Sequence, residues 1–168
     1  MKKFDADTKV VSGLAAGAVN IAGAAQTRGR RVNMANWDSI TIIAVYEAIT
    51  GQAFTLDVEQ ADAVTGGNRK TVEGLRFYES VAPSGDTDAI PDSVTATDGD
   101  DSGAPTAASA ALLWVEVTAD QLDVSGGFQY VSARLARTNS TATDGAIIYV
   151  MRGARYAVDP TDAASVLS

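Results

Sequence analysis

Alternation of apolar and polar residues with a period of two is the strongest structural signal in this chain. In residues 39–46 both alternating sets are largely apolar, which is typical of a strand in the middle of a sheet. After a turn at Thr50-Gly51-Gln52, residues 54–59 alternate strictly between apolar and polar side chains, which predicts a strand with one solvated face. We therefore expect residues 39–46 and 54–59 to pair as a β-hairpin.

Further strands are predicted along the rest of the chain, and no segment has the apolar 3.6-residue period of an amphipathic helix. The additional strands cover residues 75–78, 112–117, 128–137 and 147–151, with an edge strand at 154–158. About seven or eight strands joined by turns predict an all-β fold, an antiparallel β-sandwich that is jelly-roll-like. A chain of 168 residues is sufficient for one such core.

Two segments depart from this alternation. Residues 1–31 include the Ala/Gly-rich stretch 13–25, whose glycines disfavour a helix, and we expect an extended N-terminal arm there. Residues 82–109 are rich in Asp, Ser, Thr, Gly and Pro, and we expect a long acidic loop. The predicted organisation is therefore an arm over residues 1–31 and a β-sandwich domain over residues 32–168.

The sequence contains no histidine and no cysteine. This excludes thiolate or imidazole metal sites, cysteine nucleophiles and histidine acid–base catalysis in the chain itself. Carboxylate pairs drawn from Asp57, Glu59, Glu79 and Glu116 are conceivable as a glycosidase site, but alternation places the first two on a predicted solvated sheet face. We expect neither an enzyme nor a bound cofactor.

The formal net charge of −8 is confined to the middle of the chain, because residues 77–133 contain acidic residues and no lysine or arginine. The basic cluster Arg28, Arg30 and Arg31 is too small to bind nucleic acid in so acidic a protein. Asp5, Asp7 and Asn20 interrupt the leader-like N-terminal pattern, and no apolar run is long enough to span a membrane. We expect synthesis in a cytoplasm, with no nucleic-acid or membrane partner.

A calcium-loop-like motif occurs at residues 98–103, with oxygen ligands at the first, third and fifth positions and glycine at the sixth. The twelfth position is Ser109 rather than a bidentate Glu, which excludes an EF-hand. A solvated acidic loop is the favoured interpretation of this motif, and a generic Ca²⁺ loop is the alternative.

Five residues are candidates for binding a partner: Arg28, Arg30, Arg31, Trp37 and Trp114. The arginines belong to the predicted arm. Trp114 is opposite in phase to Leu113 and Val115, and Trp37 precedes a predicted strand. We favour the sandwich core or a subunit interface for both tryptophans, and stacking on a sugar is the alternative.

Two stretches together resemble a known pattern. The first is RGRRVNMANWDSITIIAVYEAITGQAFTLDVEQADA, and the second is GGFQYVSARLARTNSTATDGAIIYVMRGARY. They are similar to a pattern in tailed-bacteriophage capsid decoration proteins, which are also called cement or head auxiliary proteins. The shared features are a strand, an Ala-Ile-Thr-Gly turn and a closing Arg-Tyr dipeptide. Asn33 stands where that pattern has Asp.

The resemblance implies a structural virion protein with a β-sandwich fold. Such proteins commonly sit as trimers on the capsid exterior, at junctions between major capsid protein subunits, and they offer no catalytic residues to carry over. The expected partners are therefore the major capsid protein and further copies of the chain, in a homotrimer made in the host cytoplasm. The alternatives are a carbohydrate- or receptor-binding module, such as a head fibre domain, and a tail or neck component.

Overall fold

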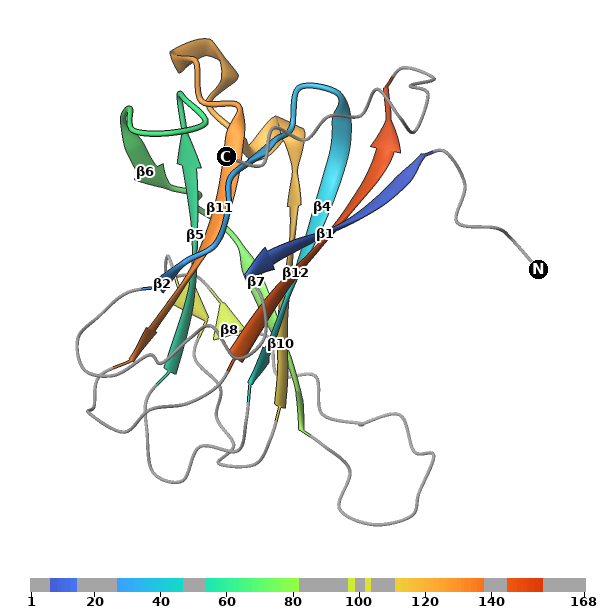
Figure 1. The fold of residues 1–168 in the computed structure, drawn as a ribbon, viewed down its shortest axis with the longest axis vertical. Coiled ribbons are helices and arrows are strands. Elements are labelled where there is room, and N and C mark those ends of the chain that lie inside the picture. Colours follow the sequence, from blue (N-terminus) through green and yellow to red (C-terminus); the bar gives the residue numbers. More distant parts are fainter. Residues whose placement is uncertain are drawn as a thin grey trace.

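The computed structural model describes residues 7–14, 27–46, 54–81, 97–98, 102–103, 111–137 and 145–155, which form two antiparallel sheets packed face to face (Figure 1). The predicted all-β sandwich is confirmed, and the described residues contain no α-helix. Sheet A has the order β1-β12-β4-β10-β7-β8. Its strands are β1 (Thr8–Leu14), β12 (Gly145–Ala154), β4 (Trp37–Tyr46), β10 (Ala111–Thr118), β7 (Arg76–Val81) and β8 (Thr97–Asp98).

Sheet B is built around the pair β11–β5, and short strands flank this pair on both sides. On one side β2 and β3 pair in turn with β11, and on the other β6 and β9 pair with β5. The bounds are β11 (Tyr130–Arg137), β5 (Phe54–Ala61), β2 (Thr27–Arg28), β3 (Val32–Asn33), β6 (Arg69–Thr71) and β9 (Ser102–Gly103).

The predicted hairpin of residues 39–46 and 54–59 is wrong. These residues lie in β4 and β5, which belong to different sheets: β4 pairs with β10 and β12, whereas β5 pairs with β11. Both strands present buried apolar residues to the same core, Ile42 from β4 and Leu56 from β5. The alternation pattern is the same whether two strands share a sheet or face each other across a core, so it does not distinguish these arrangements.

The N-terminal segment also differs from the expected arm. Residues 8–14 form β1, the edge strand of sheet A, which pairs with β12 from Thr8↔Arg152 to Leu14↔Ile147. Val11 is buried in the core, so β1 belongs to the sandwich. Residues 1–6 and 15–26 lie outside the described residues, as does most of the predicted acidic loop at 82–109, within which β8 and β9 are described.

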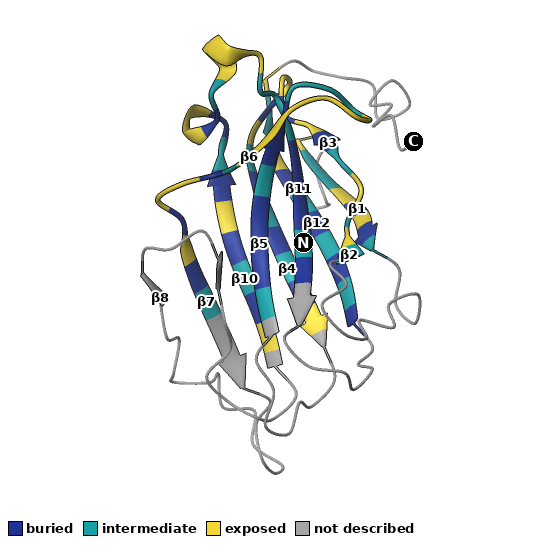
Figure 2. Cartoon of the chain, turned by 90° about the vertical axis from the view of Figure 1, so that its left-hand side faces the viewer, coloured by how far each residue is buried: buried dark blue, intermediate teal, exposed yellow. Residues whose placement is uncertain are grey.

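A single apolar core lies between the sheets. Figure 2 shows buried positions alternating with more exposed ones along the strands, and this alternation is clear in β10. The prediction that residues 39–46 form a central strand is confirmed, because β4 lies between β12 and β10. The largest fully buried side chains are Tyr149, Phe77, Met34, Ile40, Ile42, Leu56, Leu113, Leu135, Ile147 and Met151.

Tyr149 connects the two sheets through the core. Its side chain extends from β12 of sheet A, is fully buried, and its hydroxyl accepts a hydrogen bond of 3.0 Å from the backbone N–H of Ala133 in β11 of sheet B. Ala133 faces the gap between β2 and β3, where β11 has no ladder partner for this N–H. Burial raises the pKa of Tyr149 above its usual value, and the hydrogen bond from Ala133 opposes that shift only in part.

Two glycines make room for the Tyr149 ring. The backbone N–H of Gly29 donates to the carbonyl of Ala133 at 2.8 Å, and the next N–H, that of Arg30, donates to the carbonyl of Gly13 in β1 at 2.8 Å. A Cβ added to Gly13 would lie 2.5 Å from the Tyr149 Cζ atom, and one added to Gly29 would lie 2.5 Å from the hydroxyl oxygen. The segment between β2 and β3 therefore joins the edges of both sheets over a ring that only glycine accommodates.

We expect Tyr149→Phe to lower the free energy of unfolding by about 1–3 kcal/mol, because the Ala133 N–H would be buried without an acceptor. Urea denaturation followed by fluorescence measures the change. Tyr130→Phe is the control, since no side-chain hydrogen bond of Tyr130 is found within the described ranges. Equal stability of the two variants would show that the Tyr149 hydroxyl contributes nothing.

We expect Gly29→Ala to destabilise the fold by about 1–3 kcal/mol, because its methyl group collides with the Tyr149 hydroxyl. The same substitution in the Tyr149→Phe background meets no hydroxyl. Its cost there should be smaller by at least about 0.5 kcal/mol, a coupling that a double-mutant cycle resolves. Strictly additive effects would contradict the proposed contact.

Candidate functional site

The outer face of sheet A carries an unusual number of apolar side chains. Five of them form what we call the apolar strip: Val10, Ile43, Val45, Leu112 and Ile148, from β1, β4, β10 and β12. Val10, Val45 and Leu112 are 54%, 38% and 41% exposed. Scattered exposed apolar residues are normal on a protein surface, but a contiguous set marks an interaction surface.

Strand register makes the strip contiguous. Ile148 is paired with Ile43, and Ile43 with Trp114, so these three side chains form a row across β12, β4 and β10. In the row on one side of it Val45 pairs with Leu112, and in the row on the other side Val10 pairs with the half-buried Val150. Side chains directly opposite each other on one face of an antiparallel pair are close enough to touch, so the strip forms one surface.

Trp114 stacks on Tyr78 at the border of the strip. The two residues are cross-strand partners in β10 and β7, with ring centroids 5.8 Å apart and an interplanar angle of 19°. Both side chains are half-buried. The prediction that Trp114 points away from Leu113 and Val115 is confirmed, since those two residues are fully buried in the core.

A groove of about 400 Å³ lies on the other side of this aromatic pair. It is lined by Gly74, Arg76, Tyr78, Glu116, Thr118, Asp120 and Gln121, contributed by β7, β10, the turn before β7 and the 3₁₀ turn η1 (Ala119–Gln121). Hydrogen bonding from the Thr118 side chain, and then from its own backbone, lowers the pKa of Asp120. Asp120 is therefore ionised at neutral pH.

Trp37 lies in the core. It begins β4, it is 8% exposed, and it belongs to the core cluster. The interpretation of Trp37 as a core residue is confirmed, and its burial leaves little of its side chain to contact a partner. Trp37 is three residues from the buried Ile40, so strict alternation would place it on the outer face, and its burial at the start of β4 is a departure from the period of two.

The three arginines predicted to bind a partner lie in and between β2 and β3, and two of them have partners within the chain. Arg28 pairs with Glu59 at 3.1 Å. Arg31 donates to the carbonyls of Ala63 and Gly66, at 2.6 and 2.7 Å, and so anchors the loop between β5 and β6. Of the three, the exposed Arg30 makes no side-chain hydrogen bond or ion pair within the described part of the chain.

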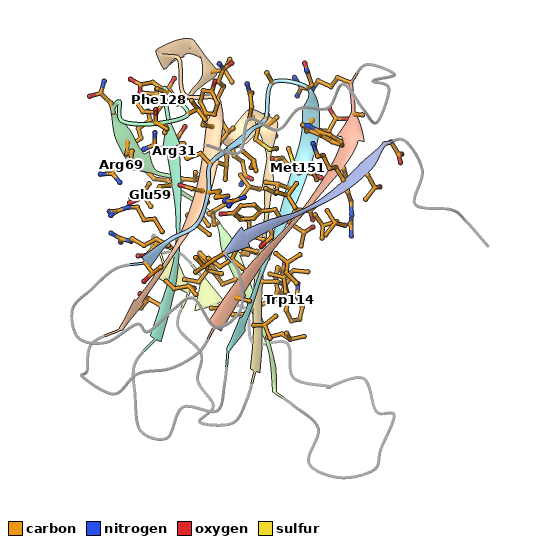
Figure 3. All side chains as sticks on the ribbon, in the orientation of Figure 1. Arg31, Glu59, Arg69, Trp114, Phe128 and Met151 are labelled. Atoms are coloured by element: carbon orange, nitrogen blue, oxygen red, sulfur yellow. The ribbon has the colours of Figure 1, made fainter. Side chains whose placement is uncertain are left out.

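The outer face of sheet B is charged, and Figure 3 shows Glu59 and Arg69 on the flank of the sandwich opposite Trp114. Arg134 in β11 pairs with Asp57 and lies 3.7 Å from Glu59. Asp57 is only 5% exposed, so the predicted solvated face is wrong for this residue, which pairs with Arg134 from the neighbouring strand β11. Asp57 and Glu59 are thus both held in ion pairs with arginines of neighbouring strands.

The calcium-loop motif at residues 98–103 lies mostly outside the described residues, which include its ends in β8 and β9. Within the described ranges, no group of three or more Asp or Glu side chains is arranged to hold a metal ion. Nor does the described part of the structure contain a helix that is long and apolar enough to cross a membrane.

The chain matches no known protein family, and a search of curated proteins found no significant relative.

The sequence missed most of this surface. Trp114 was singled out, but Tyr78, Val45 and Leu112 were not, because an apolar residue on either phase of a two-sided strand was interpreted as buried. In residues 39–46 and 112–117 the residues that alternate with the buried ones are also partly apolar, and this signal could have identified the strip. A strand needs apolar residues on both faces only where each face contacts another protein surface.

Asp123, in the connection between β10 and β11, supports a pH prediction. Its carboxylate accepts from Lys70 at 2.5 Å, Ser125 at 2.8 Å and the Gly126 N–H at 2.9 Å, and these bonds lower its pKa to about 2. The stabilisation is present above the unfolded pKa of about 3.9 and is lost as the pH falls through about 2.

We therefore expect Asp123→Asn to lower the melting temperature at pH 7, and the difference from the original protein to shrink as the pH falls from about 4 to 2. Scanning calorimetry across this range tests it. Asp7→Asn, at an exposed position before β1, controls for the loss of one carboxylate. A difference that does not change with pH would contradict the assignment.

Proposed function

We propose that this protein is a structural component of a tailed-phage virion, which binds the outside of the head through the apolar strip and stabilises contacts between major capsid protein subunits. The observation that carries the proposal is the strip itself: Val10, Val45 and Leu112 are exposed next to the half-buried Ile43 and Ile148. The sandwich fold and the sequence resemblance to capsid decoration proteins support the same role.

The physical basis of this role is preferential binding. A protein that binds only the assembled state stabilises that state by mass action, without any chemistry. An apolar surface on a flat sheet suits this task, because burial of apolar area drives most protein association. The charges of the opposite face are engaged within the chain, as in the pairs of Arg134 with Asp57 and Arg28 with Glu59.

The proposed location is the capsid exterior, and the proposed assembly is a homotrimer at a junction of capsid subunits. In this arrangement one copy contributes its apolar strip to the capsid contact. Trimerisation is tested separately, by measuring the mass of the free protein with light scattering.

We expect Leu112→Asp to weaken binding to undecorated heads of the same phage by at least about tenfold, because a carboxylate would be buried without a partner within the contact. Co-sedimentation of heads with increasing protein gives the affinity and the stoichiometry. A head that survives heating better with the protein than without it supports the stabilising role.

Val124→Asp is the matched control. Val124 is 62% exposed in the 3₁₀ turn η2 (Val124–Gly126), outside the strip, so the same substitution introduces the same charge elsewhere. Equal loss of binding in both variants, or no binding of the original protein to heads, would overturn the proposal. Circular dichroism of both variants verifies that the sandwich is intact.

A further inference from the structure

We propose that the groove beside Tyr78 binds a saccharide of one or two rings. The groove is distinct from the apolar strip, because the stacked rings of Tyr78 and Trp114 stand between them. Its volume of about 400 Å³ falls within the roughly 300–1,000 Å³ of sites that bind small molecules.

The groove combines one aromatic wall with several polar groups. Tyr78 lines it directly, and Trp114 supports the Tyr78 ring from the side of the strip. An aromatic face is a suitable platform for the C–H face of a pyranose ring, since both surfaces are flat and apolar. Cross-strand stacking on Trp114 restricts the orientation of the Tyr78 ring.

The polar groups offer both donors and acceptors. Arg76 and Glu116 are exposed at the groove, and within the described residues no ion pair joins Arg76 to Glu116 or to Asp120. The Gln121 side-chain carbonyl oxygen accepts from the backbone N–H of Thr118 at 2.9 Å, which leaves the amide nitrogen of Gln121 as a donor. Planar guanidinium, carboxylate and amide groups match pairs of neighbouring hydroxyls.

This set of charges selects against other ligands. Two carboxylates, Glu116 and Asp120, oppose one guanidinium, so a phosphate or other anion would meet net repulsion. A metal cation or an amine would be attracted by the two carboxylates but would meet the charge of Arg76 in the same groove. A neutral molecule that both donates and accepts hydrogen bonds and has one apolar face suits this mixture of groups, and a saccharide is such a molecule.

Calorimetric titration with maltose, cellobiose, lactose and N,N′-diacetylchitobiose tests the chemistry, and an array of bacterial glycans identifies the source of the sugar. We expect millimolar or tighter binding of at least one disaccharide, with a change in tryptophan fluorescence. Trp37 is buried and the chain has only two tryptophans, so that change reports on Trp114.

Arg76→Ala should weaken the binding by at least about tenfold, because it removes a charge-assisted donor. Tyr78→Phe keeps the ring and should retain most of the affinity, whereas Tyr78→Ala should abolish it. Arg152→Ala is the matched control, an exposed arginine on β12 of the same sheet but outside the groove. Unchanged melting temperatures verify the fold of each variant.

Absence of binding to every sugar at 10 mM in this titration (about 2.7 kcal/mol of binding free energy), or binding that Arg76→Ala leaves unchanged, would overturn the inference. Head binding is measured with the same variants. If sugars fail to bind while heads still bind, only the saccharide site is wrong; if sugars bind and heads do not, only the capsid role is wrong.

Discussion

The hydrogen bond between the Tyr149 hydroxyl and the Ala133 N–H organises one edge of the sandwich, because it joins the two sheets directly beside their edge strands β1 and β2. It also explains why sheet B interrupts its edge between β2 and β3. The chain leaves the ladder there so that Gly29 and Gly13 can pass close to the ring, and the hydroxyl replaces the missing strand as the acceptor for Ala133.

A buried tyrosine is tolerated at this place because its one polar atom is satisfied. With this edge closed, the molecule presents its two sheet faces outward as the surfaces open to partners.

The sequence predicts where strands occur far better than how they pair. Alternation depends on which side chains are buried, and burial is the same for Ile42 and Leu56 whether their strands are neighbours or face each other. The hairpin expectation failed for that reason. Likewise, Val11 in β1 is fixed by its pairing with Tyr149 in β12, a contact between opposite ends of the chain that no local pattern in an Ala/Gly-rich segment reveals. The sandwich itself was predictable because strand count and the lack of helical periodicity do not depend on pairing.

The candidate site was only partly predictable, because a second apolar phase has two physical origins. In residues 39–46 it was interpreted as burial on both faces, and β4 is indeed central within its sheet. Sheet B nevertheless covers only the inner face, where Ile40 and Ile42 are fully buried, while Val45 on the outer face stays exposed. Asp57 shows the reverse case: a charged residue on an outward phase is buried and pairs with Arg134 from the neighbouring strand β11. The position of a residue in the alternation of a strand gives the direction of its side chain, and only the tertiary structure determines what covers that side chain.

The two outer faces therefore have different capacities for binding. On sheet B, Glu59 is shared among Arg28, Arg69 and Arg134, so a partner that docked there would first have to break ion pairs that already offset the cost of desolvation. On sheet A the apolar strip has no such cost, since its burial removes hydrocarbon from water without stranding a charge. The side chains of the strip are uncharged, so none of the net charge of −8 lies on them. The strip therefore suits a partner that offers a large apolar area, whereas the outer face of sheet B keeps its charges in contacts within the chain.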